Sequence, residues 1–273
     1  MFITRVLTGA VLTVILGLVV YFSHIPAVLN VLIAFLSVKG IVELYKATKL
    51  YNNKLITALS CAAAIVISFE DIPDIFCIVG VLFIAAVILF GVLMSKIKEK
   101  QKIESILSVI IAVMITFFFK SLSGVRNAEN GVYLLGVTML ISVLTDIFAY
   151  LCGKGFGKHK LAPVLSPKKT IEGSVGGTMC ATAILMIAAL LLSNNNVISV
   201  NYGILAIYLI SASVLGQFGD LAFSSVKRIS GIKDYGKLLP GHGGVLDRFD
   251  SMLFVAPFTY LFSICANGFI TVV

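Results

Sequence analysis

Charged side chains are scarce in this chain. Asp, Glu, Lys and Arg make up 12% of its 273 residues, whereas hydrophobic residues make up 59%, and the mean hydropathy is +1.06. The core of a soluble domain does not need so much apolar surface. This composition therefore excludes an ordinary soluble protein and predicts an all-α, polytopic membrane protein.

Cysteine motifs are also missing. The five cysteines lie in or at the end of apolar segments, and no two of them form a CxxC pair. This placement favours buried packing over metal binding or redox chemistry. We also find no low-complexity linker, no internal repeat and no separate soluble domain.

The apolar residues form about nine segments that can serve as transmembrane helices, for which about 20 residues each are required. These segments are 4–22, 25–45, 55–69, 73–95, 103–120, 131–152, 172–193, 203–225 and 250–271. The third is short, so a re-entrant helix and a total of eight stay open. We divide this single membrane unit into amino-terminal helices at 1–130 and a carboxyl-terminal part at 131–273.

The basic residues predict the orientation of these segments. With nine alternating spans, 19 of the 21 Lys and Arg residues fall on one side, and only Lys120 and Arg126 fall on the other. Basic loops favour the cytoplasmic side of a membrane. We therefore expect a multi-pass protein of the cell membrane. Its amino terminus and its long loops at 153–171 and 226–249 are cytoplasmic, and its carboxyl terminus is outside.

A net charge of +8 raises the question of nucleic acid as a partner. The basic residues are spread over five loops at the membrane edge and do not form one continuous stripe. Anionic lipid headgroups account for this distribution, so we expect membrane lipids and no nucleic acid as partners.

Asp146 lies in the apolar string LISVLTDIFAYL. An acidic residue near the centre of a membrane helix costs about 2.5 to 3.5 kcal/mol. Two interpretations are open: Asp146 is a cation ligand in a polar cavity, or it lies near enough to the cytoplasmic edge to meet water or Lys154.

Asp220 presents a similar case in the string SVLGQFGDLAFSSVKR. On a helix it shares one face with Ser224 and Lys227, which places it toward the polar loop that follows. The nearby Gly216 and Gly219 leave room for a substrate or for a closely packed helix.

Two further aspartates end that polar loop. Asp247 and Asp250 are three residues apart, so on a helix they share a face and can bind one divalent cation through oxygen ligands. Helix initiation is the alternative, because acidic residues favour the first turn of any helix. Just before them, Gly243 and Gly244 follow His242 in a loop that can present backbone N–H groups to an anion.

Basic residues alternate with these acids. Flanking Lys and Arg commonly extend to lipid headgroups, and we accept this for Lys237. For Lys227, Arg228 and Arg248, the alternation with aspartates such as Asp234 favours a neutralised polyphosphate site.

The loop at 153–171 contains a second basic string. Lys168 and Lys169 can bind an acidic lipid headgroup or the phosphates of a nucleotide. Thr170 can cap the following helix and Glu172 falls in its first turn, so part of the string is explained by helix initiation.

These residues resemble the signature of the phosphatidate cytidylyltransferases, which are CDP-diacylglycerol synthases. The matching positions within residues 224–250 are Ser224, Lys227, Arg228, Lys233, Asp234, Gly236, Leu239, Pro240, His242, Gly243, Gly244, Asp247, Arg248 and Asp250. The string SPKKTIEG at 166–173 is similar to the family's second characteristic segment.

The resemblance implies an integral membrane enzyme that requires Mg²⁺. It transfers the cytidylyl group of CTP to phosphatidic acid, which gives CDP-diacylglycerol and pyrophosphate. The residues expected in catalysis are Asp220, Asp247, Asp250, Lys227, Arg228 and His242. Those expected to bind substrate are Lys168, Lys169, Lys233, Asp234, Gly243, Gly244, Arg248 and Ser224. The expected metal ligands are Asp220, Asp247, Asp250 and Asp146, and a homodimer is implied by resemblance alone.

Two other classes compete with this interpretation. A secondary transporter would use Asp146 and Asp220 to carry protons or cations, but the polar residues concentrate at one edge and no repeated half is visible. A CDP-alcohol phosphotransferase also uses clustered aspartates and metal, but its acids follow a more compact pattern.

Overall fold

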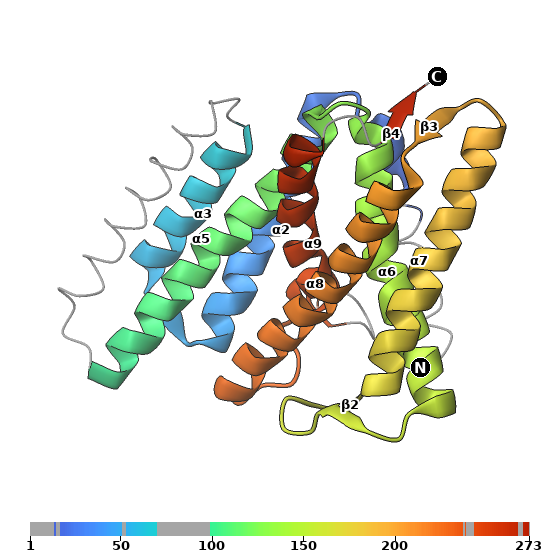
Figure 1. The fold of residues 1–273 in the computed structure, drawn as a ribbon. Helices are drawn as coiled ribbons and strands as arrows, with labels where there is room; N and C mark the ends of the chain where they lie inside the picture. The colour runs from blue at the N-terminus through green and yellow to red at the C-terminus, as the bar shows by residue number, and fades with distance from the viewer. Residues whose placement is uncertain are drawn as a thin grey trace. The chain divides into compact units, whose positions relative to one another are not determined.

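The chain folds into long helices with two short two-stranded sheets (Figure 1). This computed structural model describes residues 14, 17–50, 53–69, 99–236, 238, 243–266 and 270–272. Its helices are α2 (Pro26–Ala47), α3 (Lys54–Phe69), α5 (Glu99–Asn127), α6 (Gly131–Phe156), α7 (Ile171–Asn194), α8 (Tyr202–Ile229) and α9 (Leu246–Cys265). Its strands are β1 (Lys160–Ala162), β2 (Ser166–Thr170), β3 (Ile198–Val200) and β4 (Ile270–Val272).

The helices confirm the membrane class. Among the described residues, five are long and apolar enough to cross a membrane, namely α2, α5, α6, α7 and α8. Large apolar side chains on their surfaces remain uncovered: Met179 is 67% exposed, Ile207 62% and Phe218 61%. Exposed apolar surface on this scale is expected to face lipid.

The predicted total of nine spans is not confirmed. The segment 73–95 lies outside the described residues. Of segment 4–22 only residues 14 and 17–22 are described, and these are helical. The short third segment forms α3, which has 16 residues, so whether it crosses the membrane stays a prediction. The last helix, α9, begins at Leu246, four residues earlier than expected.

The chain divides into two units, 1–123 with 229–248 and 124–228 with 249–273. The predicted division at residue 130 within one membrane unit stays a prediction. The segment 229–248 groups with the first unit, although it is distant from that unit in sequence. We describe each unit by itself.

In the first unit, α2 packs against α3 and α5. The buried Tyr45 hydroxyl hydrogen-bonds the Ser60 hydroxyl at 2.9 Å, and Lys120 Nζ donates to the Ser68 carbonyl at 3.2 Å. A Cβ at Gly40 would lie 3.1 Å from Leu246 Cδ2, so α2 also contacts the start of α9 closely.

In the second unit, a row of hydrogen-bonded polar side chains joins α6, α7 and α8. The Thr145 hydroxyl donates to Ser213 at 2.9 Å, and Ser213 donates to Thr178 at 3.0 Å. Gln217 Nε2 also donates to Thr178 at 2.9 Å, and Ser174 donates to Gln217. Such interhelical hydrogen bonds stabilise helix pairs in lipid, and this row ends one turn before Asp220.

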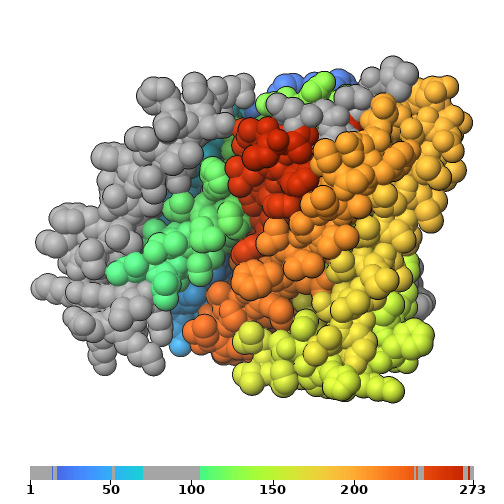
Figure 2. Space-filling view, viewed as in Figure 1, coloured from blue at the N-terminus to red at the C-terminus, as the bar shows by residue number. Residues whose placement is uncertain are grey.

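Two pairs of short antiparallel strands belong to the second unit. Strands β1 and β2 pair within the predicted loop 153–171, with Lys160 opposite Thr170, and this segment lies at the surface beside α7 and α8 (Figure 2). Strand β3 pairs with β4 from Ile198 opposite Val272 to Val200 opposite Ile270. None of the four strands was predicted from the sequence.

Candidate active site

The predicted site residues fall into two groups, one in each unit. Asp247, Arg248, Lys233, Asp234, Gly243 and Gly244 belong to the first unit, and the remaining described ones belong to the second. His242 lies outside the described residues, as do Lys237, Leu239 and Pro240, so their predicted roles stay predictions.

Asp247 closes the turn at residues 243–247, which we call the α9 turn. Its Oδ2 accepts hydrogen bonds from the backbone N–H of Tyr235 at 2.8 Å and of Gly244 at 3.0 Å. The side chain is 8% exposed. A carboxylate in the first helical turn that accepts a backbone N–H from the residue preceding the N-cap stabilises the start of the helix. The helix-initiation alternative therefore has a structural basis at Asp247.

The glycines of the α9 turn are required by its geometry. Gly243 has φ +89°, a backbone conformation that L side chains rarely adopt. A Cβ at Gly244 would collide with the carboxylate of Glu43. The Gly244 N–H is donated to Asp247 within the turn. Backbone conformation thus explains Gly243 and close packing explains Gly244, and the binding of an anion by this loop stays a prediction.

Glu43 is the site residue that sequence reasoning missed. Its side chain is buried, with 7% exposed. Its two oxygens accept hydrogen bonds from the backbone N–H groups of Val245 and Leu246, both at 2.9 Å. The available signal was one acidic residue inside the apolar string KGIVELYK, which by itself marks a functional candidate in a membrane segment.

Other signature residues of the first unit face outward. Lys233, Asp234 and Arg248 are exposed, so their side chains are accessible to a substrate. Gly236 packs against Glu43, because a Cβ there would fall 2.5 Å from Glu43 Oε1.

In the second unit, Asp146, Asp220 and Asp250 come together as an aspartate cluster. Asp250 is 6% exposed, and the charges of Asp220, Asp146 and Lys227 all act on its carboxylate. Lys169 forms an ion pair with Asp220. The structure thus brings together three predicted metal ligands and two predicted phosphate-binding lysines.

Hydroxyl groups hold this aspartate cluster in place. The Ser224 hydroxyl donates to Asp220 Oδ1 at 3.2 Å, which confirms the predicted helical face. The Ser251 hydroxyl donates to Asp146 Oδ2 at 3.3 Å. A Cβ at Gly219 would lie 2.7 Å from the Asp250 carbonyl oxygen, so this glycine permits close helix packing.

Aspartate oxygens suit a hard divalent cation. Within the described part of the chain, no three His, Cys, Asp or Glu side chains are arranged to hold a metal ion by themselves. Asp247 and Asp250 both lie in the first turns of α9, as predicted, and a cation shared between them stays a prediction.

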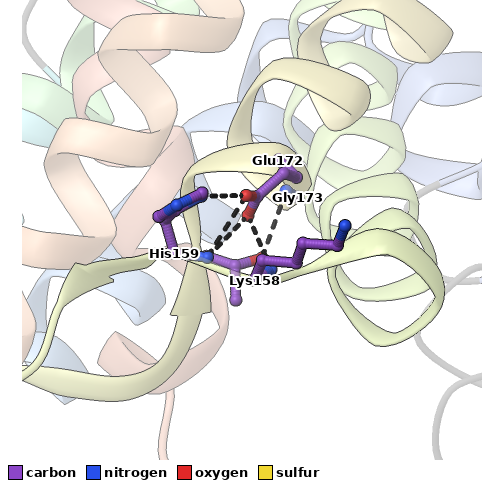
Figure 3. Close-up of polar contacts among 5 residues, drawn as sticks. Lys158, His159, Glu172 and Gly173 are labelled. Atoms are coloured by element: carbon purple, nitrogen blue, oxygen red, sulfur yellow. Dashed lines mark hydrogen bonds and ion pairs between the residues drawn. The ribbon is translucent and has the colours of Figure 1, made fainter.

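The β1–β2 hairpin is anchored by Glu172, in the first turn of α7 (Figure 3). Its carboxylate accepts from the backbone N–H of Lys158 at 3.0 Å and from His159 Nδ1 at 2.6 Å. Thr170 caps α7, because its hydroxyl accepts from the Gly173 N–H at 3.2 Å. Both predicted roles in helix initiation are confirmed.

Arg228 connects this hairpin to the end of α8. Its Nε donates to the Leu165 carbonyl at 3.2 Å, and most of the side chain is exposed. Lys168 is exposed on β2, while Lys169 turns to Asp220. The two adjacent lysines therefore have different surroundings.

Comparison with known proteins identifies the fold family. A family model described as "Cytidylyltransferase family" matches residues 3–266. The chain is 45% identical over 147 residues to a phosphatidate cytidylyltransferase of Staphylococcus aureus, covering 54% of this chain and 53% of the relative. It is 44% identical over 129 residues to the phosphatidate cytidylyltransferase of Staphylococcus haemolyticus, covering 47% and 48%. The matched stretch spans about half the length of these relatives. Because the family match covers nearly the whole sequence, the chain belongs to the cytidylyltransferase family.

Proposed function

We propose that this chain transfers the cytidylyl group of CTP to phosphatidic acid, forming CDP-diacylglycerol and pyrophosphate. The observation that carries this proposal is the cytidylyltransferase family match over residues 3–266. The names of the Staphylococcus relatives support the choice of phosphatidate as the acceptor.

The aspartate cluster supports a phosphate-handling reaction at a membrane. Two lysines, Lys169 and Lys227, act on carboxylates that lie among apolar helices. A site that holds both acidic and basic side chains suits a nucleotide, because its phosphates need cations. It also suits a lipid whose headgroup is a phosphate monoester.

Mg²⁺ belongs to this proposal, and the residues present fit it. Mg²⁺ is usually bound through one or two carboxylates, with substrate phosphates and water completing its coordination. Asp220 and Asp250 offer such carboxylates, with Asp146 and Asp247 as further predicted ligands. When bound, the cation would neutralise charge on the phosphates of CTP.

The proposed reaction is one in-line displacement. A phosphate oxygen of phosphatidic acid forms a bond to the α-phosphorus of CTP, the bond from that phosphorus to the β-phosphate oxygen breaks, and pyrophosphate leaves. The nucleophile is already ionised, so no general base is required. Catalysis then rests on positioning and on electrostatic stabilisation.

The chain's own residues supply that positioning. We assign phosphate contacts to Lys227, Arg228, Lys233 and Arg248, of which the last three are exposed. Lys169 keeps Asp220 neutralised before substrate arrives. An incoming phosphate can bind Lys169, which would leave the Asp220 carboxylate available as a ligand for a divalent cation.

The orientation and assembly are part of the same proposal. The enzyme lies in the cell membrane with its amino terminus and active-site loops on the cytoplasmic side, where CTP is available, and its carboxyl terminus outside. It acts as a homodimer among membrane lipids. Cross-linking in native membranes, read as a doubling of apparent mass, tests the dimer.

The test of the reaction is a substrate-omission assay with purified protein in detergent. Protein, CTP, phosphatidic acid and Mg²⁺ are combined, each is left out in turn, and CDP-diacylglycerol and pyrophosphate are measured. The proposal expects equal amounts of both products only in the complete mixture. Folded protein that forms neither product with any phosphatidic acid supplied contradicts it, and solute flux in proteoliposomes then tests transport.

A further inference from the structure

Glu43 contacts a segment 200 residues away in the sequence. It lies on α2, and its carboxylate accepts the N–H groups of Val245 and Leu246 at 2.9 Å each. Both partners belong to the same unit as Glu43. The contact ties an amino-terminal helix to the segment that carries the signature residues.

Burying a carboxylate is costly unless its charge is compensated. Glu43 is compensated by two N–H groups in the first turn of α9, where the helix macrodipole places partial positive charge. Lys39, one turn earlier on α2, also acts on this carboxylate. The arrangement is therefore a satisfied buried acid, held by donors that only a formed α9 turn can present.

Glu43 and Asp247 divide the donors of the turn between them. Asp247 takes the N–H groups of Gly244 and Tyr235, and Glu43 takes those of Val245 and Leu246. Three successive amides are thus bound by two carboxylates of the protein. These amides hold the turn in shape and are not offered to a substrate phosphate.

Two glycines leave the space that the Glu43 carboxylate occupies. A Cβ at Gly244 or at Gly236 would run into the Glu43 carboxylate. Leu246, whose N–H Glu43 binds, also packs closely on Gly40 of α2. Side-chain and backbone contacts therefore fix the same end of α9.

We infer that Glu43 is a positioning residue for the cytidylyltransferase reaction. By holding the N–H groups of Val245 and Leu246, it fixes the α9 turn and hence the direction of Asp247 and Arg248. This inference rests on the proposed function. It assigns to α2 a direct part in shaping the site, although Glu43 itself touches no reacting atom.

The test compares Glu43→Gln and Glu43→Ala with the wild type. Gln keeps the volume but offers one acceptor oxygen, and its NH₂ group meets a backbone N–H donor. Ala removes both acceptors. Glu129→Gln, which removes an exposed acid in another loop, is the matched control for charge.

Two properties are expected to change together: the hydrogen exchange of the α9 turn and the catalytic behaviour. Hydrogen exchange at the amides of 244–246, measured by mass spectrometry in detergent, is expected to accelerate in both Glu43 variants. Turnover is expected to fall about 10- to 100-fold, and the Mg²⁺ concentration for half-maximal rate to rise, as for supports of metal-binding residues. Glu129→Gln is expected to change neither readout.

The outcomes separate this inference from the proposed function. A wild type without cytidylyl transfer overturns the proposed function, while the exchange measurement still decides whether Glu43 holds the turn. Unchanged exchange in Glu43→Gln overturns the inference. A lowered melting temperature with wild-type turnover and wild-type Mg²⁺ dependence also overturns the inference, because that pattern indicates only a structural role. If Glu43→Ala fails to insert, Glu43→Gln decides alone.

Discussion

Asp250 lies in surroundings that disfavour a charged carboxylate. Its carboxylate is buried, and the negative charges of Asp220 and Asp146 act on it, opposed by Lys227. Its Oδ1 accepts the Ser251 N–H at 2.9 Å. A buried acid beside two like charges is expected to destabilise the fold, so its presence indicates a functional requirement.

Asp250→Asn is therefore expected to separate stability from activity. Asn keeps the volume and an oxygen for the Ser251 N–H, but it removes a charge from among like charges. We expect turnover to fall about 100-fold or more and the melting temperature to stay level or rise, measured on the purified variant in detergent. A variant with a lower melting temperature and normal turnover would show that the Asp250 carboxylate stabilises the fold.

At this scale, single aspartates could be predicted because an acid in an apolar string is conspicuous. Asp146 and Asp220 were found in this way, and Asp250 was found by its spacing of three residues from Asp247. The contact partners of the buried acids could not be predicted, because nothing in the sequence places Lys169 beside Asp220 or Glu43 beside Val245. Both contacts join residues that are distant along the chain.

The helices were predictable as elements because apolar length is a strong local signal. The predicted segments 131–152 and 172–193 correspond to α6 and α7 within a few residues. The strand pairs were not predictable. Strands β3 and β4 have three residues each and pair across about 70 positions, and β2 contains Pro167 and two lysines, which are poor strand signals.

The α9 turn gives a prediction at the scale of an element. Gly244→Ala adds a methyl group against the Glu43 carboxylate, and overpacking of this kind costs about 1 to 3 kcal/mol. We expect a lower melting temperature and a loss of turnover. Gly136→Ala in α6, where a Cβ meets nothing within 4 Å, is the control and is expected to be neutral or stabilising. Equal behaviour of the two variants would contradict the packing described for the turn.

The whole molecule is expected to have a fixed orientation across the membrane. Helix α7 has 24 residues, about 36 Å of helix, which is enough to cross the hydrocarbon core. Its two flanks therefore lie on opposite sides. The basic hairpin at its amino-terminal end is expected in the cytoplasm, and Asn195 is expected outside.

Cysteine labelling tests this orientation. In a background without the five native cysteines, Asn195→Cys is expected to react with a membrane-impermeant maleimide in intact cells. Lys158→Cys is expected to react only after permeabilisation. Both side chains are exposed. The reverse pattern would place the basic loops outside and overturn the charge-based assignment.

The membrane class and the family could be predicted at this largest scale, because composition and the residues of 224–250 are visible in the sequence itself. The grouping of 229–248 with the amino-terminal unit could not. It depends on contacts such as that of Glu43 with the α9 turn, which no local pattern reveals.

The most direct measurement follows the position of a label in CTP. Purified protein is supplied with phosphatidic acid, Mg²⁺ and CTP labelled at either the α- or the γ-phosphate, and the organic and aqueous phases are counted. The account predicts that α-label enters the lipid while γ-label leaves as pyrophosphate. Label from the γ-phosphate in lipid, or no label in lipid from either form, would contradict cytidylyl transfer by this chain.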